Sequence, residues 1–253
     1  MPEQPPILFI HGAFSRGSHC DAWARYFSAA GFECHAPSLP GHEPPDLAAL
    51  ARLGMDEFLA ALQVVRSALP GPPIVIGHSM GGLLGQQLAA TGPCAALVCL
   101  AAAPPWMLRP QPRSLPYFLP LARRILSGQP LIPSERTLRY LALHDLLETE
   151  QTELLKTVVP ESGRAYRSMV LGTARVKVSK VRCPVLCLGG DQDRIVACKI
   201  SRKLATLYKG DHLVLEGRGH WLLSRTGHEK AAGVVLQWLE RRLQRMPGAE
   251  SRT

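Results

Sequence analysis

The sequence predicts an α/β fold, in which helices cover both faces of a mostly parallel, doubly wound sheet of about six strands. Short apolar runs typical of buried parallel strands alternate with longer stretches of helical spacing. Glycine or proline lies near each apolar run, as expected where strands meet loops. The chain has 253 residues, 46% of them hydrophobic, which is enough for a sizeable core in one domain with an insertion or in two small domains.

Six segments are expected to form the strands. They are residues 6–10, 32–39, 73–79, 95–101, 184–190 and 212–217. Five segments between and after them have helical spacing, and several begin near Ser, Thr or Asp. They are residues 21–30, 55–69, 80–91, 197–207 and 226–245. Because strands and helices alternate, right-handed crossovers should make the strands parallel and cover both faces of the sheet.

The alternation is interrupted once, after the fourth expected strand. Residues 104–180 contain no good strand, and they open with eight prolines before residue 134. Helical spacing follows, over 135–147, 149–158 and 162–176, and the amphipathic pattern of LRYLALHDLL argues against a disordered linker. We therefore expect a helical lid at 104–180, inserted into a core made of 1–103 and 181–246, with a flexible tail at 247–253.

Composition argues against several classes of protein. No apolar stretch approaches the roughly 20 residues of a membrane span, and the N-terminus does not resemble a secretion signal, so a cytoplasmic location is expected. Seven scattered cysteines without a C-x-x-C pair do not indicate a zinc or redox site. The net charge of +9 raises nucleic acid as a partner, but no basic run with interleaved aromatic residues supports it.

One serine, Ser79, lies in GHSMGG between an expected strand and an expected helix. A tight strand-to-helix turn makes such a hydroxyl protrude, and it leaves room only for very small residues two positions before and after the serine. Gly77 and Gly81 occupy these positions. The start of the next helix also offers free amide groups that favour an anion. The pattern is typical of a nucleophilic serine. The alternative, simpler interpretation is a serine that only caps the helix.

A nucleophilic serine needs a histidine as base and a carboxylate that fixes the tautomer of that histidine. His220 lies in a glycine-containing loop after the last expected strand, at the end of the sheet where α/β folds gather functional groups. Asp193 follows the fifth expected strand in GGDQDRIV, and its G-x-x-D spacing favours it over Asp191. Ser79, Asp193 and His220 are therefore the candidate catalytic residues.

Five motifs together resemble the α/β-hydrolase superfamily over almost the whole chain outside the expected lid. They are HGAF (11–14), PSLPGHE (37–43), GHSMGG (77–82), GGDQDRIV (189–196) and GRGH (217–220). The resemblance implies Ser79 as nucleophile, His220 as general base and then acid, and Asp193 as the orienting carboxylate. It also implies an oxyanion hole made by the backbone amides of Ala13 and Met80, since the first follows H-G after a strand and the second begins the helix after Ser79.

The sequence departs from the family's pattern in two places. Many members begin with two further strands, whereas this chain starts almost at once on the strand before HG, which resembles a branch with an abbreviated sheet of six strands. Ala197 also stands where members often have proline, which weakens the local match around the candidate carboxylate.

The resemblance implies a carboxylesterase-like serine hydrolase that cleaves small-molecule acyl esters through an acyl-enzyme, without cofactor or metal. Thioesterase, lactonase, C–C hydrolase, acyltransferase and perhydrolase activities use the same triad and remain alternatives. An alternative from another class is a non-catalytic small-molecule-binding protein on the same fold. Such a protein does not need a base aligned on a serine.

Other residues near the motifs have less specific interpretations. Phe14, Trp106 and Trp221 either line the substrate pocket or are ordinary packing aromatics. Among the remaining histidines, His11 and His78 are expected to bond the turn backbone, His42 to cap a loop and His144 to lie on a lid helix.

The expected lid carries most of the positive charge of the chain. Residues 104–180 contain twelve Arg and Lys against six Asp and Glu, so they account for +6 of the net +9. The simpler interpretation is an exposed basic face. The alternative is that the lid attracts anionic substrates, or an acidic surface, by long-range electrostatic steering.

Overall fold

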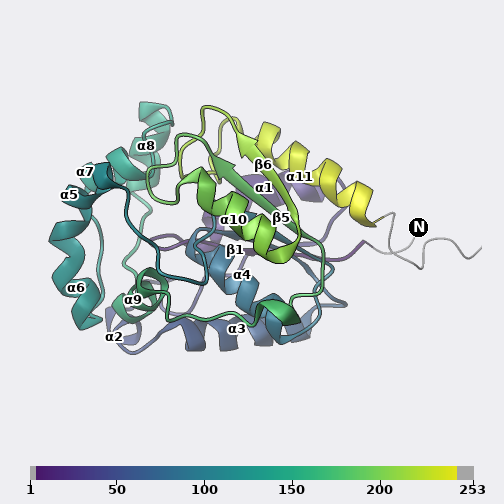
Figure 1. Cartoon of the computed structure of the whole chain (residues 1–253), viewed down its shortest axis with the longest axis horizontal. Helices are drawn as coiled ribbons and strands as arrows, with labels where there is room; N and C mark the ends of the chain where they lie inside the picture. Colours follow the sequence, from purple (N-terminus) through teal and green to yellow (C-terminus); the bar gives the residue numbers. More distant parts are fainter. Residues whose placement is uncertain (1–3, 244–253) are drawn as a thin grey trace, which may run out of the picture.

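Residues 4–243, the part of the chain that the computed structural model describes, form one sheet of six strands (Figure 1). The spatial order is β2-β1-β3-β4-β5-β6, and every neighbouring pair is parallel. The strands are β1 (Ile7–Ile10), β2 (Cys34–His35), β3 (Ile74–His78), β4 (Ala96–Leu100), β5 (Val185–Gly190) and β6 (Asp211–Leu215).

Helices cover both faces of the sheet, because alternate residues of each strand face two separate apolar cores. On one face, Ile7 and Ile76 share a core with α1 (Asp21–Ala29) and α11 (His228–Leu243). On the other face, Leu8 and Val75 share a core with three helices. These are α3 (Met55–Ala68), α4 (Met80–Thr91) and α10 (Cys198–Tyr208). The arrangement confirms the predicted parallel, doubly wound α/β fold.

Strand β2 is much shorter than expected. The sequence predicts a strand over 32–39, but only Cys34 and His35 pair with β1. Strand β2 lies at the edge of the sheet, and Pro37 and Pro40 follow it without a backbone N–H to donate. The chain therefore leaves the sheet early.

Between β4 and β5, residues 104–180 form what we call the helical segment. Its helices gather on one side of the molecule (Figure 1, left). They are α5 (Leu115–Phe118), α6 (Ala122–Ser127), α7 (Glu135–Leu141), α8 (Glu148–Leu155) and α9 (Gly163–Leu171). Helices α7, α8 and α9 begin within one residue of the expected positions, but each ends earlier than expected.

Within residues 4–243, three short α-helices were not predicted. They are α5, α6 and the single turn α2 (Leu47–Leu50). In α5, Pro116 lies at the start of the helix, where a missing N–H costs nothing, so the proline-rich sequence is compatible with helical turns. In α2, the side chain of Asp46 caps the turn by accepting a hydrogen bond from the Ala49 N–H at 3.0 Å.

No helix within residues 4–243 combines the length and the apolar character that crossing a bilayer requires. The expected flexible tail, residues 247–253, lies outside the described residues, as do the ends of the expected core at 1–3 and 244–246.

Candidate active site

Ser79 lies in the tight turn between β3 and α4 and has a φ of 53°, in the left-handed region that non-glycine residues rarely adopt. A Cβ atom on Gly77 would run into the backbone of Gly81, and one on Gly81 would run into the carbonyl of Ile10. The Ser79 N–H donates to the Leu100 carbonyl at 3.0 Å, which holds the turn against β4. The fold therefore maintains a strained backbone at the candidate nucleophile.

The structure brings Ser79, His220 and Asp193 together from three loops at the carboxyl ends of β3, β6 and β5. Ser79 Oγ lies 3.0 Å from His220 Nε2, and His220 Nδ1 lies 2.8 Å from Asp193 Oδ2. All three side chains are buried. A carboxylate only accepts, so Nδ1 carries the proton, and Nε2 is free to accept the proton of the serine.

The structure also separates the two candidate carboxylates. Asp193 Oδ1 accepts from the backbone N–H groups of Ile195 at 2.7 Å and Val196 at 2.9 Å, while Oδ2 faces His220. Asp191 is exposed, and within residues 4–243 its carboxylate has one side-chain contact, 3.5 Å from Gln192 Nε2. The geometry therefore favours Asp193 as the group that orients His220.

The two amides of the expected oxyanion hole come from the loop after β1 and from the start of α4, both beside Ser79. A Cβ built on Gly12 would stand 3.1 Å from Ser79 Cβ, so the chain entering Ala13 passes directly beside the serine. Met80 is the first residue of α4. Within the described residues, neither the Ala13 N–H nor the Met80 N–H donates to a protein acceptor, which leaves both amides available.

Three buried histidines around the turn are held neutral. Burial lowers the pKa of His11 to about 3, of His78 to about 3 and of His19 to about 4. His11 Nε2 accepts from the Leu39 N–H at 2.9 Å, and the His78 Nε2–H donates to the His220 carbonyl at 2.8 Å. His11 and His78 thus bond the backbone of the site, as expected from the sequence.

We expect the free energy of unfolding to fall as the pH drops from 7 to 5. Below pH 6.5 the unfolded chain takes up protons at His11, His19 and His78 that the folded chain does not. Each group then costs about 2 kcal/mol at pH 5, at 1.36 kcal/mol per unit of pKa difference. Ordinary carboxylates hardly titrate in this interval. The pKa of His42, which contacts with Glu161 raise, opposes the loss, whereas the pKa values of His144 and His212, which burial lowers, add to it, so urea unfolding at pH 7, 6 and 5 measures the net fall. Equal midpoints at all three pH values would contradict it.

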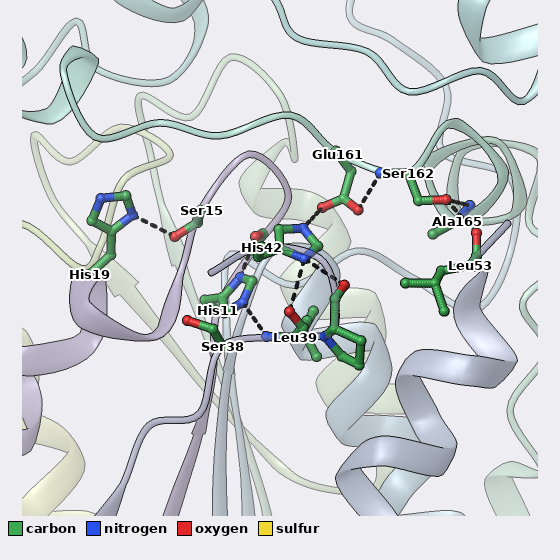
Figure 2. Close-up of polar contacts among 12 residues, drawn as sticks. His11, Ser15, His19, Ser38, Leu39, His42, Leu53, Glu161, Ser162 and Ala165 are labelled. Atoms are coloured by element: carbon green, nitrogen blue, oxygen red, sulfur yellow. Dashed lines mark hydrogen bonds and ion pairs between the residues drawn. The ribbon is translucent and has the colours of Figure 1, made fainter. Parts of the chain in front are cut away.

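His42 and Glu161 form a second buried pair, which joins the loop after β2 to the helical segment (Figure 2). Both side chains are fully buried, and His42 Nε2 lies 3.0 Å from Glu161 Oε2. His42 Nδ1 faces the Leu39 and Pro40 carbonyls at 3.2 Å, so with Glu161 ionised both ring nitrogens meet acceptors, which favours the doubly protonated ring. Although burial alone would lower it, the Glu161 contacts raise the net pKa of His42.

An enclosed, mainly apolar cavity opens beside Ser79 and His220, between the sheet and the helical segment. Phe14 and Trp221 line it, as expected for pocket residues. Trp106, the third residue considered for the pocket, is not among the residues that line this cavity. Its backbone passes tightly against Gly172, and its half-buried side chain packs on the core, which agrees with the alternative of a packing aromatic. No charged Lys, Arg, Asp or Glu side chain of the described residues lines this cavity.

The helical segment contacts three loops that contribute to the site, those after β1, β5 and β6. Gln111 Nε2 donates to the Asp193 carbonyl at 2.8 Å, and Asp145 pairs with Arg218 at 3.0 Å, two residues before His220. On the loop after β1, the Phe14 carbonyl accepts from the Val159 N–H at 3.1 Å.

These long-range contacts were missed by sequence reasoning, because no local spacing indicates them. His42 was expected to cap a loop, and it does contact the Leu39 carbonyl, but its pairing with Glu161 was not foreseen. His144 was expected on a lid helix and instead lies in the turn after α7, because that helix ends at Leu141. The structure packs this turn against Gly219 of the loop that carries His220.

The parallel sheet, the strained serine turn and the buried Ser–His–Asp cluster define the class of protein. The chain belongs to the alpha/beta hydrolase family, whose sequence profile matches residues 7–233. Membership of this family, together with curated relatives that are named as hydrolases, supports hydrolase activity.

Two curated proteins illustrate the similarity in sequence. A pyrethroid hydrolase of Sphingobium wenxiniae is 37% identical over 76 residues, which are 30% of this chain and 27% of that protein. The match therefore spans about a quarter of the hydrolase. The magnesium-chelatase 30 kDa subunit of Rhodobacter capsulatus is 26% identical over 250 residues, covering 93% of this chain and 87% of that protein.

Solved structures of low sequence identity share the fold. The methylesterase MES16 from Arabidopsis superposes with a TM-score of 0.75 and 17% identity, covering 94% of this chain and 100% of that chain. The monoacylglycerol lipase of Paleococcus ferrophilus superposes with a TM-score of 0.74 and 20% identity, covering 96% of each chain.

Proposed function

We propose that this protein is a serine hydrolase that cleaves carboxylic esters of small molecules through an acyl-enzyme. The observation that carries the proposal is the chain of contacts from Ser79 Oγ to His220 Nε2 and from His220 Nδ1 to Asp193. Ser79 and His220 also line an apolar cavity. A ligand-binding protein without catalysis does not need a buried base aligned on a serine in a strained turn.

In the first half of the proposed reaction, Ser79 Oγ attacks the ester carbonyl carbon while His220 Nε2 takes the hydroxyl proton. The Ala13 and Met80 amides donate to the oxygen that becomes negative, and such donors are typically worth about 3–4 kcal/mol each. When the bond to the alcohol oxygen breaks, His220 returns its proton to the leaving alcohol. Asp193 stabilises the imidazolium that exists between these two proton transfers.

In the second half, His220 takes a proton from a water molecule, whose oxygen attacks the acyl carbon. The bond between that carbon and Ser79 Oγ then breaks, and His220 returns the proton to Ser79. The carboxylic acid leaves, and the enzyme is restored without a cofactor or a metal ion. The helical segment, residues 104–180, acts in this proposal as a lid on a core made of residues 1–103 and 181–246.

Labelling with a fluorophosphonate tests the proposal directly. We expect the probe to modify Ser79 and no other serine, because Ser79 is paired with His220 and lies beside the cavity. Ser15 is an internal control, since it also contacts a histidine, His19 at 2.8 Å, but is fully buried. Peptide mapping by mass spectrometry identifies the modified residue. Labelling that persists in Ser79→Ala, or the absence of labelling in the wild type, would contradict the proposal.

The basic charge of the helical segment leads to a separate test. If the segment steers anionic esters, kcat/KM for an ester that carries a carboxylate should fall as salt rises, because the Debye length shrinks from about 10 Å at 0.1 M to about 3 Å at 1 M. A neutral isostere is the control and should respond little. The uncharged lining of the cavity favours the simpler interpretation, an exposed basic face, which predicts equal salt curves for the two esters.

A further inference from the structure

A second apolar hollow lies on the outside of the helical segment, next to the cavity at Ser79. It is a groove between the short helices α5 and α6 on one side and α9 on the other. The groove and the cavity share four lining side chains, Leu108, Phe118, Tyr166 and Ile195. This shared layer of four side chains therefore lies between the cavity and the groove.

The groove includes two strongly exposed leucines. Leu119 is 70% exposed and Leu126 is 64% exposed, and both line it. Apolar surface in water carries a free-energy cost of about 25 cal/mol per Å² relative to burial, so a chain laid along these leucines would be stabilised. The residues described as lining the groove include no Lys, Arg, Asp or Glu, and a charged ligand would find no ionic partner there.

We propose that the groove binds the far end of a long, uncharged apolar chain of the ester substrate, and that Phe118 controls its passage from the cavity. This inference rests on the proposed ester hydrolysis and specifies its substrate class. The occupant is a substrate chain, not a partner protein, because the groove lies directly behind side chains that also line the cavity at Ser79. When the ester group of a long chain lies at Ser79, the far end of the chain extends beyond the enclosed cavity. The apolar side chains of the groove can bind that end.

Phe118 is the member of the shared layer that can be changed with least effect on the rest of the molecule. Leu108 and Tyr166 are buried, and the Ile195 N–H donates to Asp193. Phe118 is only partly buried, at the end of the four-residue helix α5. Its side chain is therefore a specificity-determining element that does not hold the catalytic groups.

The test measures kcat/KM for p-nitrophenyl butyrate and p-nitrophenyl dodecanoate. We expect Phe118→Ala to raise the dodecanoate-to-butyrate ratio, because the smaller side chain eases passage from the cavity to the groove. We expect Leu126→Gln to lower the ratio about tenfold, because the loss of apolar contacts with one or two methylene groups changes specificity by roughly 10-fold or more. Leu147→Gln is the matched control. Leu147 is 65% exposed in the same helical segment but lines neither hollow, so its ratio should equal that of the wild type.

Ratios that stay unchanged in both Phe118→Ala and Leu126→Gln, while butyrate is cleaved normally, would overturn the inference. Calorimetric binding of dodecanamide, an uncharged chain that is not an ester, provides a readout independent of turnover. Weaker binding to Leu126→Gln than to Leu147→Gln supports the groove, and equal binding overturns it. If the wild type cleaves no ester at all, the proposed function fails, and the binding comparison still decides the role of the groove.

Discussion

Replacing Ser79 or His220 by alanine is expected to lower kcat roughly 10⁶-fold for any ester that the wild-type protein cleaves, because either change removes the activated nucleophile. The two losses should not add in the double variant, since the residues act as one unit. Circular dichroism and urea unfolding show whether each variant still folds. A folded Ser79→Ala variant that retains ester turnover would contradict the assignment.

The candidate orienting carboxylate, Asp193, can be tested against a neighbouring carboxylate. Asp193→Asn should lower kcat about 10⁴-fold, because the amide no longer holds His220 in the tautomer that leaves Nε2 free. Asp191→Asn is the matched control, two residues away, exposed, and without contact to His220. We expect it to behave like the wild type. The reverse order of sensitivity would show that Asp191 is the orienting group.

Replacing Glu161 by alanine is expected to lower the free energy of unfolding by about 3–5 kcal/mol, because it leaves the buried His42 imidazolium without its counter-charge. Both partners are fully buried and 3.0 Å apart. The change should appear as a large shift in the urea midpoint at pH 7.

Glu153→Ala is the control for Glu161→Ala. Glu153 pairs with Lys156 at 2.6 Å, but both side chains are 63% exposed, and water screens such pairs. Its urea midpoint should stay close to that of the wild type. Equal midpoints for the two variants would show that the His42–Glu161 pair does not stabilise the fold.

The fold could be predicted because buried parallel strands are recognisable as short apolar runs in one stretch of sequence. The length of β2 could not, since it depends on where an edge strand stops pairing with β1. The motifs placed Ser79, Asp193 and His220 on separate loops, and the structure brings these side chains within hydrogen-bonding distance. Their catalytic roles, and the role of residues 104–180 as a lid, stay predictions.

Side-chain direction and long-range pairing were beyond sequence reasoning. Trp106 lies next to the start of the expected lid in sequence, but whether its side chain lines the cavity depends on how the loop packs against α9. Glu161 lies 119 residues from His42, and Asp145 lies 73 residues from Arg218. No periodicity connects such positions, because the contact exists only once the helical segment has packed on the loops of the sheet.

The contacts of the helical segment with three loops of the candidate site, those after β1, β5 and β6, limit how this protein could be recombined with its relatives. Gln111 holds the Asp193 loop, Asp145 holds Arg218 beside His220, and Val159 holds the loop that contains Ala13 and Phe14. A segment 104–180 taken from a homologue would lack the residues that make these contacts. We expect chimaeras that exchange residues 104–180 alone to retain the sheet and lose the alignment of the site, whereas chimaeras that also carry the matching loops should preserve both.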